Sequence, residues 1–147
     1  MSSPQLDLDS FLPYRLSVLS NRISQSIAQL YAERFGISIT EWRVIAVLGR
    51  YSGLSANQVA ERTAMDKVAV SRALARLVER GLIARSTDDD DRRRSVLVLS
   101  ASGKRIHTQI APLALEMEHK LLAGFDKEER RLLDRLLGKL SESQQRL

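Results

Sequence analysis

Residues 54–83 read LSANQVAERTAMDKVAVSRALARLVERGLI, and this stretch predicts two short helices joined by a tight turn. Ser55, with Gln58 three residues later, forms the capping box that opens a helix. Asp66 is suited to cap the next helix, and Gly81 is suited to end it in the left-handed conformation. Two short helices joined in this way are typical of a helix-turn-helix motif. The two predicted helices span residues 55–63 and 66–80.

The second of these helices is expected to have two different faces. The apolar side chains that gather on one side predict packing against a core, and they are Val70, Leu74, Leu77 and Val78. The other side carries small residues near its start, with Arg72 and Arg76 one turn apart and Lys67 and Ser71 flanking them. This combination lets a backbone lie deep in the major groove of DNA while guanidinium groups reach guanine edges or phosphates. The alternative is that both arginines simply solvate a surface helix.

A β-hairpin is predicted after the helix-turn-helix. Its two strand-like runs lie at residues 82–86 and 95–99. The segment between them, residues 87–94, reads TDDDDRRR. Since side chains two apart in an extended chain point the same way, Asp91 lies beside Arg93 and can orient its guanidinium for a minor groove. Arg92 and Arg94 are then available for flanking phosphates. The alternative is a solvated turn whose charges pair only weakly.

Long amphipathic helices are predicted on both sides of these elements. An apolar stripe at steps of three and four predicts a helix over residues 10–35, with Pro13 in its first turn and Gly36 closing it. Ser38 and Glu41 have the spacing of a capping box for the following helix, which is nearly all apolar and is expected to be buried.

Two further helices are predicted after the hairpin. Ser100 caps the first, which is expected to bend near Pro112, and Asp126 opens the second with Glu129 at the matching box position. The predicted fold is therefore mainly α with a small β-hairpin (α+β). A chain of 147 residues fits one domain of this kind.

The composition excludes several classes of function. The chain has no cysteine, which rules out a disulfide scaffold, a thiolate metal site and a thiol redox sensor. His107 and His119 have no carboxylate pair, phosphate-binding loop or nucleophile motif near them, so no enzyme, metal or cofactor is expected. The net charge of +5 suggests a polyanionic partner without proving one. With no leader-like start and no long apolar run, the chain is expected to be cytoplasmic and to have no membrane partner.

Three segments together carry a resemblance to a known family. They are LSANQVAER at 54–62, MDKVAVSRALARLVERGLI at 65–83 and DRRRSVLVLSASG at 91–103. In this order they resemble the multiple antibiotic resistance regulator (MarR) family of winged helix-turn-helix transcription factors, over about residues 10–142. Asp91 and Arg93 match the wing-tip motif of that family, and Ser100 stands where the family usually has Thr. By position, the resemblance implies DNA contacts from Asn57, Lys67, Ala69, Ser71, Arg72, Arg76 and Arg93.

The resemblance also implies an assembly. Residues 1–147 would form a single domain that pairs as a homodimer through helices at 10–35 and 101–144, with a DNA-binding lobe at 38–100. The sequence agrees independently, because long apolar stripes beside a small winged domain need a partner. A two-fold dimer places its recognition helices about one turn of DNA apart, which predicts a pseudopalindromic double-stranded site.

Regulation by a small molecule is a further implication. Members of the family usually act as repressors that are released by a small aromatic or carboxylic effector bound between the dimerisation helices and the winged domain. The residues that could line such a cleft are Tyr14, Tyr31, Trp42, Arg43 and His107. The alternative for these side chains is an ordinary place in the core. An alternative function also stays open, a winged-helix protein-interaction module that does not bind DNA.

Overall fold

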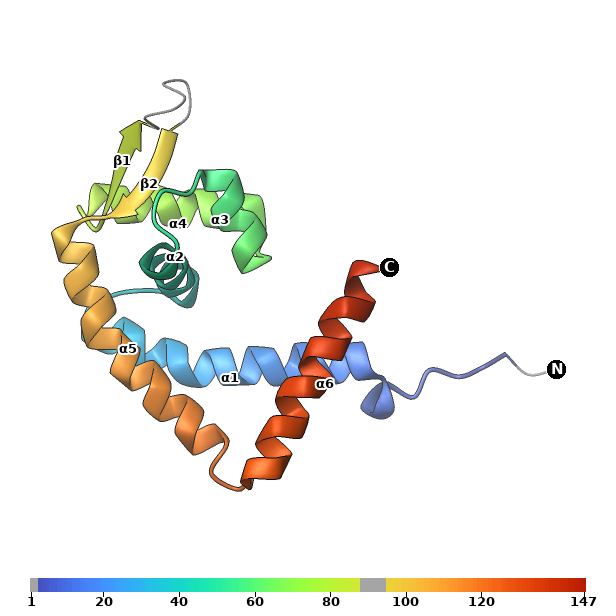
Figure 1. Cartoon of the computed structure of the whole chain (residues 1–147). Coiled ribbons are helices and arrows are strands. Elements are labelled where there is room, and N and C mark those ends of the chain that lie inside the picture. Colours follow the sequence, from blue (N-terminus) through green and yellow to red (C-terminus); the bar gives the residue numbers. More distant parts are fainter. Residues whose placement is uncertain (1–2, 88–94) are drawn as a thin grey trace. The chain divides into compact units, whose positions relative to one another are not determined.

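The computed structural model describes residues 3–87 and 95–147 of the chain. Helices dominate these residues and a two-stranded antiparallel sheet accompanies them (Figure 1), as the sequence predicts. The chain divides into two compact units, Met1–Ile110 and Ala111–Leu147. In chain order the elements are η1 (Leu8–Ser10), α1 (Leu12–Phe35), α2 (Ile39–Arg50), α3 (Ala56–Thr63), α4 (Lys67–Glu79), β1 (Ile83–Thr87), β2 (Ser95–Leu99), α5 (Ala101–Leu121) and α6 (Lys127–Gln145).

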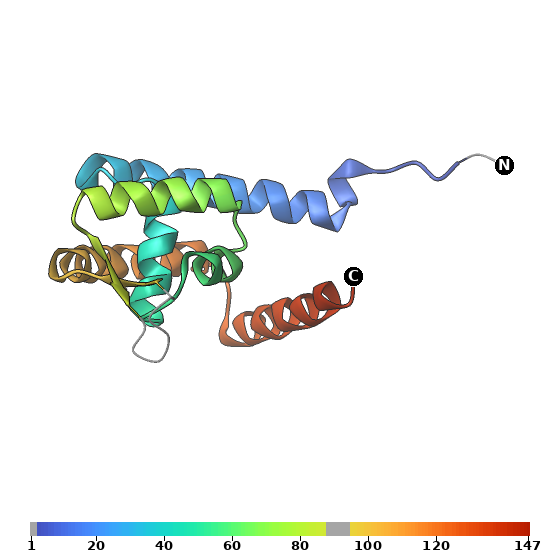
Figure 2. The same cartoon turned by 90° about the horizontal axis from the view of Figure 1, so that it is seen from above.

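The core of the first unit forms around α2, which contacts α1, α3 and α4. Figure 2 shows that α2 runs across the direction of α4. The largest fully buried side chains of this core include Tyr31, Ile37, Ile45, Leu77, Leu97 and Ile110. Each buried side chain of this size contributes about 1.5 to 3 kcal/mol relative to an exposed one. The helix-turn-helix is thus stabilised by packing on an apolar core that α1, α2 and the hairpin share, and not only by contacts between α3 and α4.

Side chains cap the helices where the sequence predicts. The Ser38 hydroxyl accepts a hydrogen bond from the backbone amide of Glu41 at 3.1 Å, which opens α2. Complete capping boxes open α3 at Ser55 and α6 at Asp126. The capping box predicted at the start of α2 is wrong in one half, because the Glu41 side chain lies in an ion-pair network instead of returning to the amide of Ser38.

The first helix begins later than the sequence predicts. A short 3-10 turn, η1, occupies the residues just before it, and there the Ser10 hydroxyl donates to the carbonyl and carboxylate oxygens of Asp7 at 3.2 and 3.0 Å. Ser10 therefore serves this turn and does not cap α1, which starts at Leu12 with Pro13 in its first turn. At the other end Gly36 adopts the predicted left-handed conformation, with a φ of 63°.

The turn between α3 and α4 is built without glycine. Ala64 closes α3 in the left-handed conformation, with φ 52° and ψ 30°, a region that alanine rarely occupies. Asp66 then caps α4 by accepting a hydrogen bond from the Ala69 amide at 3.0 Å. This short passage turns the chain between the two helices of the motif.

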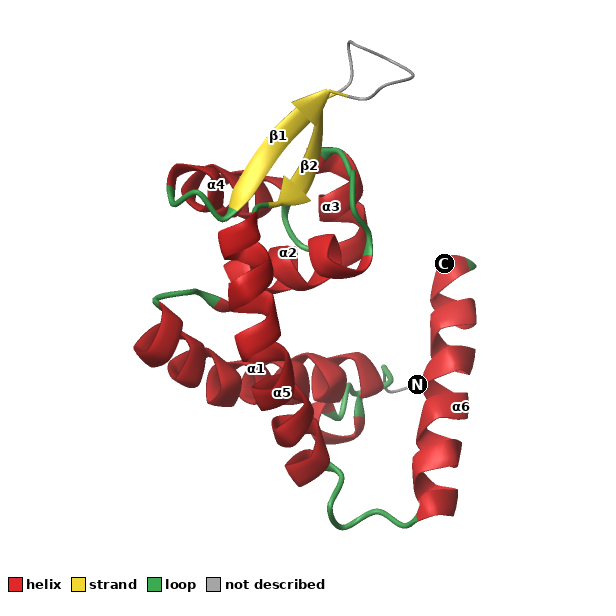
Figure 3. Ribbon diagram, turned by 60° about the vertical axis from the view of Figure 1, so that its left-hand side comes forward, coloured by secondary structure: helices red, strands yellow, loops and turns green. Residues whose placement is uncertain are grey.

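The hairpin pairs in the register Ile83↔Leu99 to Thr87↔Ser95, and Figure 3 shows its two strands as yellow arrows beside the helices of this unit. β1 starts one residue later than predicted, because the amide of Leu82 donates to the carbonyl of Leu77 at 2.9 Å and so completes the end of α4. An isolated bridge between Leu54 and Leu97 ties the chain before α3 to β2.

Ser100 joins the two ends of the hairpin. Its hydroxyl donates to the carbonyl of Gly81 at 2.6 Å and accepts from the amide of Gly103 at 3.0 Å. The predicted cap of α5 is confirmed, and the same oxygen links the start of α5 to the turn that precedes β1. α5 continues through Pro112 as one helix, and the bend expected there stays a prediction.

The second unit contains the end of α5 and all of α6. Arg130 in the first turn of α6 donates to the carbonyls of Leu122 and Phe125 at 2.9 and 3.3 Å, which fixes the connection between the helices. Many large apolar side chains are exposed in this unit, and they include Leu115, Leu121, Phe125, Leu132, Leu136, Leu137 and Leu140. Within residues 3–87 and 95–147, no helix combines the length and the apolar character needed to cross a bilayer.

Candidate nucleic-acid interface

The two faces predicted for α4 are present. Its buried side is formed by Val70, Ala73, Leu74 and Leu77, with Val78 half-buried. The opposite side exposes Arg72 and Arg76, and Lys67 and Ser71 at the start of the helix are also exposed. Ala69 is half-buried, and its amide is occupied by the Asp66 cap. The exposed side of α4 thus carries two guanidinium groups, and the side chains near the N-terminal end of the helix are small.

The helix before α4 is placed to support this face. α3 packs against α4, and its Asn57 is exposed in the first turn, directly after the Ser55 capping box. An exposed amide at a helix N-terminus, beside free backbone donors, is suited to contact a phosphate oxygen. Asn57 is therefore an exposed polar group on the supporting helix, and its contact with DNA stays a prediction.

The remaining predicted contacts belong to the segment that joins β1 and β2. Asp91, Arg92, Arg93 and Arg94 lie outside the described residues. The strands that lead into and out of this segment are paired up to Thr87 and Ser95. The assignment of these four residues to DNA contacts stays a prediction from the sequence.

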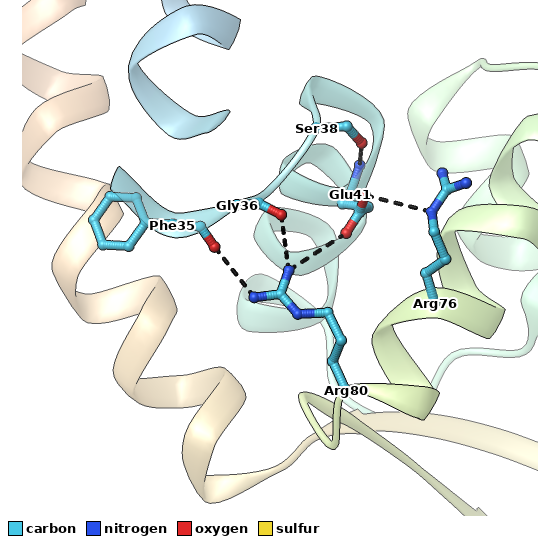
Figure 4. A network of polar contacts seen from close by, with 6 residues as sticks. All are labelled: Phe35, Gly36, Ser38, Glu41, Arg76 and Arg80. Carbon is cyan, nitrogen blue, oxygen red and sulfur yellow. Dashed lines mark hydrogen bonds and ion pairs between the residues drawn. The ribbon is translucent and has the colours of Figure 1, made fainter. Parts of the chain in front are cut away.

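A buried carboxylate lies behind the exposed face of α4 (Figure 4). Glu41, in the first turn of α2, has a side chain only 8% exposed. Its Oε1 lies 3.5 Å from Nε of Arg76, and its Oε2 lies 3.9 Å from Nη1 of Arg80. The Arg76 side chain is itself 54% exposed. Of the two arginines of α4 that are predicted to contact DNA, Arg76 is therefore paired with a buried acidic group.

Arg80 extends this network to the end of α1. Its Nη1 donates to the Gly36 carbonyl at 2.9 Å and its Nη2 to the Phe35 carbonyl at 3.1 Å, as Figure 4 shows. These carbonyls are left without partners by the end of a helix, where positive charge is favoured. The same guanidinium thus connects α1, α2 and α4.

The spacing of residues in the sequence did not predict this network around Glu41. Glu41 stands three residues after Ser38, and this spacing assigned it to a capping box. A second signal was present, because Glu41 directly precedes the almost entirely apolar part of α2 and is the first buried residue of that helix. A buried carboxylate needs a cationic or hydrogen-bonding partner, but the spacing alone does not identify it.

The residues proposed for an effector cleft separate into two groups. Tyr31, Trp42 and His107 form a row, with ring centroids 5.5 Å apart for the first pair and 5.8 Å apart for the second. Arg43 lies elsewhere on α2, where it donates to Ser24 Oγ at 2.8 Å. Tyr14 is exposed near the start of α1. The structure brings three of the five residues together and leaves two apart from them.

His107, at one end of the aromatic row, borders a hollow in the first unit. His107 lies against Gly49, and a hollow of about 370 Å³ opens beside these residues. Its other lining residues are Leu48, Ser52, Leu99, Lys104 and Thr108. At the inner end of the row, Tyr31 is fully buried and its hydroxyl has no hydrogen-bond partner among the residues that the structure describes. Burial raises the pKa of this phenol above its ordinary value of 10.0.

Comparison with known proteins gives consistent results. A family model described as MarR family matches residues 35–94. The uncharacterized HTH-type transcriptional regulator YcgE of Bacillus subtilis (strain 168) is 30% identical over 115 residues, which is 78% of this chain and 74% of that protein.

Solved structures extend the similarity to almost the whole chain. A MarR/EmrR family transcriptional regulator from Acinetobacter sp. ADP1 is 29% identical, with a TM-score of 0.90 over 97% of this chain and 100% of that one. The MepR protein of S. aureus, solved as a complex with DNA, is 26% identical, with a TM-score of 0.79 over 90% of this chain and 98% of that one. Both structures share the fold of this chain.

Proposed function

The chain belongs to the MarR family of transcriptional regulators, and from this premise we propose that it acts as a homodimer that reads a pseudopalindromic DNA site. A regulator of this family is a DNA-binding protein and not an enzyme. The proposal is that α4 of each copy enters a major groove, while the segment joining β1 and β2 reaches the adjacent minor groove with Arg93. We place the protein in the cytoplasm, where it would meet its DNA.

The exposed face of α4 is the observation that carries the proposal. Arg72 and Arg76 lie one helical turn apart above a buried apolar face. Small side chains at Ala69 and Ser71 leave room for a close approach to the bases near the helix start. A surface helix that is merely solvated gains nothing from this arrangement, whereas a helix in a major groove needs it. The similar MepR protein was solved as a complex with DNA, which supports DNA binding by this chain.

Exposed apolar side chains support the homodimer. At the start of α1, the exposed apolar residues are Phe11 just before the helix and Leu12, Tyr14, Leu16 and Leu19 within it. α6 exposes Leu132, Leu136, Leu137 and Leu140. A monomer would leave these rows in water at a cost of about 25 cal/mol for each Å² of apolar surface. A second copy of the chain, paired by two-fold symmetry, would cover them and set two α4 helices against one duplex.

We also propose that the protein is a repressor and that a small effector controls it. A repressor of this type releases DNA when a small aromatic or carboxylic molecule binds beside the winged lobe. The support for an aromatic effector comes from the row of Tyr31, Trp42 and His107 and from the hollow beside His107. Tyr14 and Arg43 lie apart from this row and add no support. Fluorescence of Trp42 gives a direct readout, since an aromatic molecule bound against it should quench the emission.

The experiment that tests the proposal is selection of bound duplexes from a random pool with the purified full chain. A symmetric consensus with two half-sites about one turn apart is expected, together with a dimer in sedimentation equilibrium. Affinity should fall steeply with salt, by about 0.9 in log K per log unit of salt for each neutralised phosphate. A dimer that ignores duplex DNA would overturn the proposal and favour the winged-helix protein-interaction module instead.

A further inference from the structure

We propose that Glu41 is a positioning residue for DNA reading, which holds the Arg76 guanidinium by its Nε and so directs Arg76 toward a base rather than toward phosphates. The inference rests on the proposed function, because it concerns how α4 reads DNA. Figure 4 shows the arrangement, in which Glu41 of α2 lies between Arg76 and Arg80 of α4. Glu41 itself does not face solvent and does not contact DNA.

The position of the carboxylate is fixed from its own helix. The backbone amide of Glu41 donates to the Ser38 hydroxyl at 3.1 Å, so this residue belongs to the capped first turn of α2. Its side chain is 8% exposed and has both oxygens near guanidinium groups. A carboxylate in such a place cannot turn into water and stays with its partners. Glu41 therefore offers a rigid support under α4.

The two arginines play different parts in the network. Arg80 is fixed by the carbonyls of Phe35 and Gly36 as well as by Glu41. Arg76 meets Glu41 through Nε, the nitrogen closest to the backbone, and its side chain is 54% exposed. Arg80 thus anchors the carboxylate, and the carboxylate anchors the stem of the exposed guanidinium.

A held guanidinium discriminates better than a mobile one. A mobile arginine on α4 can swing to the nearest phosphate, a contact that carries no sequence information. A guanidinium fixed at Nε keeps its donors aimed in one direction, as bidentate recognition of a guanine edge requires. The cost of ordering a long side chain is then met within the folded protein and not during binding.

The charge of Glu41 acts in the same direction. A carboxylate beside Arg76 offsets part of the attraction between its guanidinium and a phosphate anion. A guanine edge carries no net charge, so its hydrogen bonds to Arg76 lose far less. Glu41 should therefore lower affinity for random DNA more than it lowers affinity for the selected site, which raises the ratio between the two.

The decisive variant is Glu41→Gln, which keeps the shape and the hydrogen-bonding oxygen but removes the charge. We expect the ratio of affinity for the selected site to affinity for random duplex to fall roughly tenfold, the discrimination of one good base contact. We also expect the salt slope for random duplex to steepen by about one, because Arg76 becomes free to bind a phosphate. The matched control is Glu33→Gln, which removes the same charge from an exposed position on α1, outside the helix proposed to read DNA, and should leave the ratio unchanged.

Two further variants keep the test independent of folding. Arg76→Lys changes a residue on an exposed helix face and keeps its positive charge. One ammonium group cannot contact Glu41 and a base edge together, so the ratio of affinity for the selected site to affinity for random duplex should fall as it does in Glu41→Gln. In an Arg76→Ala background, Glu41→Gln should change the ratio no further, as a double-mutant cycle would show.

The outcomes separate the two proposals. A purely structural Glu41 would lower both affinities in parallel and leave the salt slope unchanged, and this result would overturn the positioning role alone. A wild-type chain with no preference for any duplex would overturn the proposed function and the positioning role with it. An unchanged ratio in Arg76→Lys would also contradict the role of the Nε contact.

Discussion

Gly103 in α5 lies directly against the carbonyl group of Leu82, at the point where the end of α4 passes into β1. A Cβ at Gly103 would collide with the Leu82 oxygen and would lie 3.1 Å from its carbonyl carbon. The same oxygen accepts a hydrogen bond from the Ser100 amide at 3.0 Å. The base of the hairpin therefore requires a residue without a side chain at the start of α5.

We expect Gly103→Ala to lower the free energy of unfolding by about 1 to 3 kcal/mol, because the backbone of Leu82 or α5 must shift. Urea denaturation measures the change. The matched control is Gly138→Ala in α6, where an added Cβ would have no atom within 4 Å. This substitution should stabilise the protein by about 0.5 to 1 kcal/mol through helix propensity. Equal effects of the two substitutions would contradict the close contact at Leu82.

Removal of the Tyr31 hydroxyl should not destabilise the protein. This oxygen is buried without a hydrogen-bond partner among the described residues, so it carries a desolvation cost that no contact offsets. We expect Tyr31→Phe to leave the free energy of unfolding unchanged or to raise it by up to about 1 kcal/mol. Tyr14→Phe, at an exposed position on the same helix, serves as the control. A loss above about 1 kcal/mol would show that the hydroxyl has a partner.

Alkaline pH should act through the same residue. Burial raises the pKa of Tyr31 above 10.0 in the folded protein, so the unfolded chain loses this proton first as the pH rises. The folded state then binds more protons than the unfolded state, and the free energy of unfolding decreases with pH. The stability from Tyr31 is complete below pH 10 and is lost as the pH rises toward the folded pKa. Denaturation curves of Tyr31→Phe should show a smaller loss in this range than those of the wild type.

Arg80→Ala should weaken the junction of α1, α2 and α4. The substitution removes the donors to the Phe35 and Gly36 carbonyls and leaves Glu41 with one of its two cationic partners. We expect a loss of about 1 to 3 kcal/mol, since a buried carboxylate and the end of α1 lose charged hydrogen-bonding groups. Thermal unfolding gives the measurement, with Arg34→Ala in the exposed last turn of α1 as the control. Similar values for both variants would argue against the network.

The two kinds of arginine should affect DNA binding differently. Arg72→Ala is expected to relax sequence preference at one base pair by about 1 to 3 kcal/mol, because it removes a contact to a base edge. Arg93→Ala should instead weaken binding more evenly across sequences, since a minor groove carries less sequence information. Footprinting and repeated duplex selection with both variants measure the difference. The reverse pattern would exchange the two assignments.

Local signals in the sequence predicted most of the fold. Ser55, Asp66 and Asp126 cap the helices that they were expected to cap, because a helix N-terminus is decided by side chains within three residues. The hydrophobic spacing of α4 likewise predicted its buried and exposed sides. The errors at the starts of α1 and β1 are of one or two residues and come from competing local hydrogen bonds at Ser10 and Leu82.

Contacts between distant parts of the chain could not be predicted in this way. Glu41 meets arginines that follow it by more than thirty residues, and no periodicity relates α2 to α4. The bridge from Leu54 to Leu97 is equally distant. The candidate site was therefore predicted as a set of exposed residues on α4, while the acidic support behind Arg76 became visible only in three dimensions.

The hydroxyl of Ser100 has a consequence for tolerance to mutation. It connects Gly81 to the start of α5, so the base of the hairpin is closed by residues that precede β1 and follow β2. Because this closure uses no atom of residues 88–94, we expect substitutions in that segment to alter DNA binding while leaving the stability of the first unit nearly unchanged.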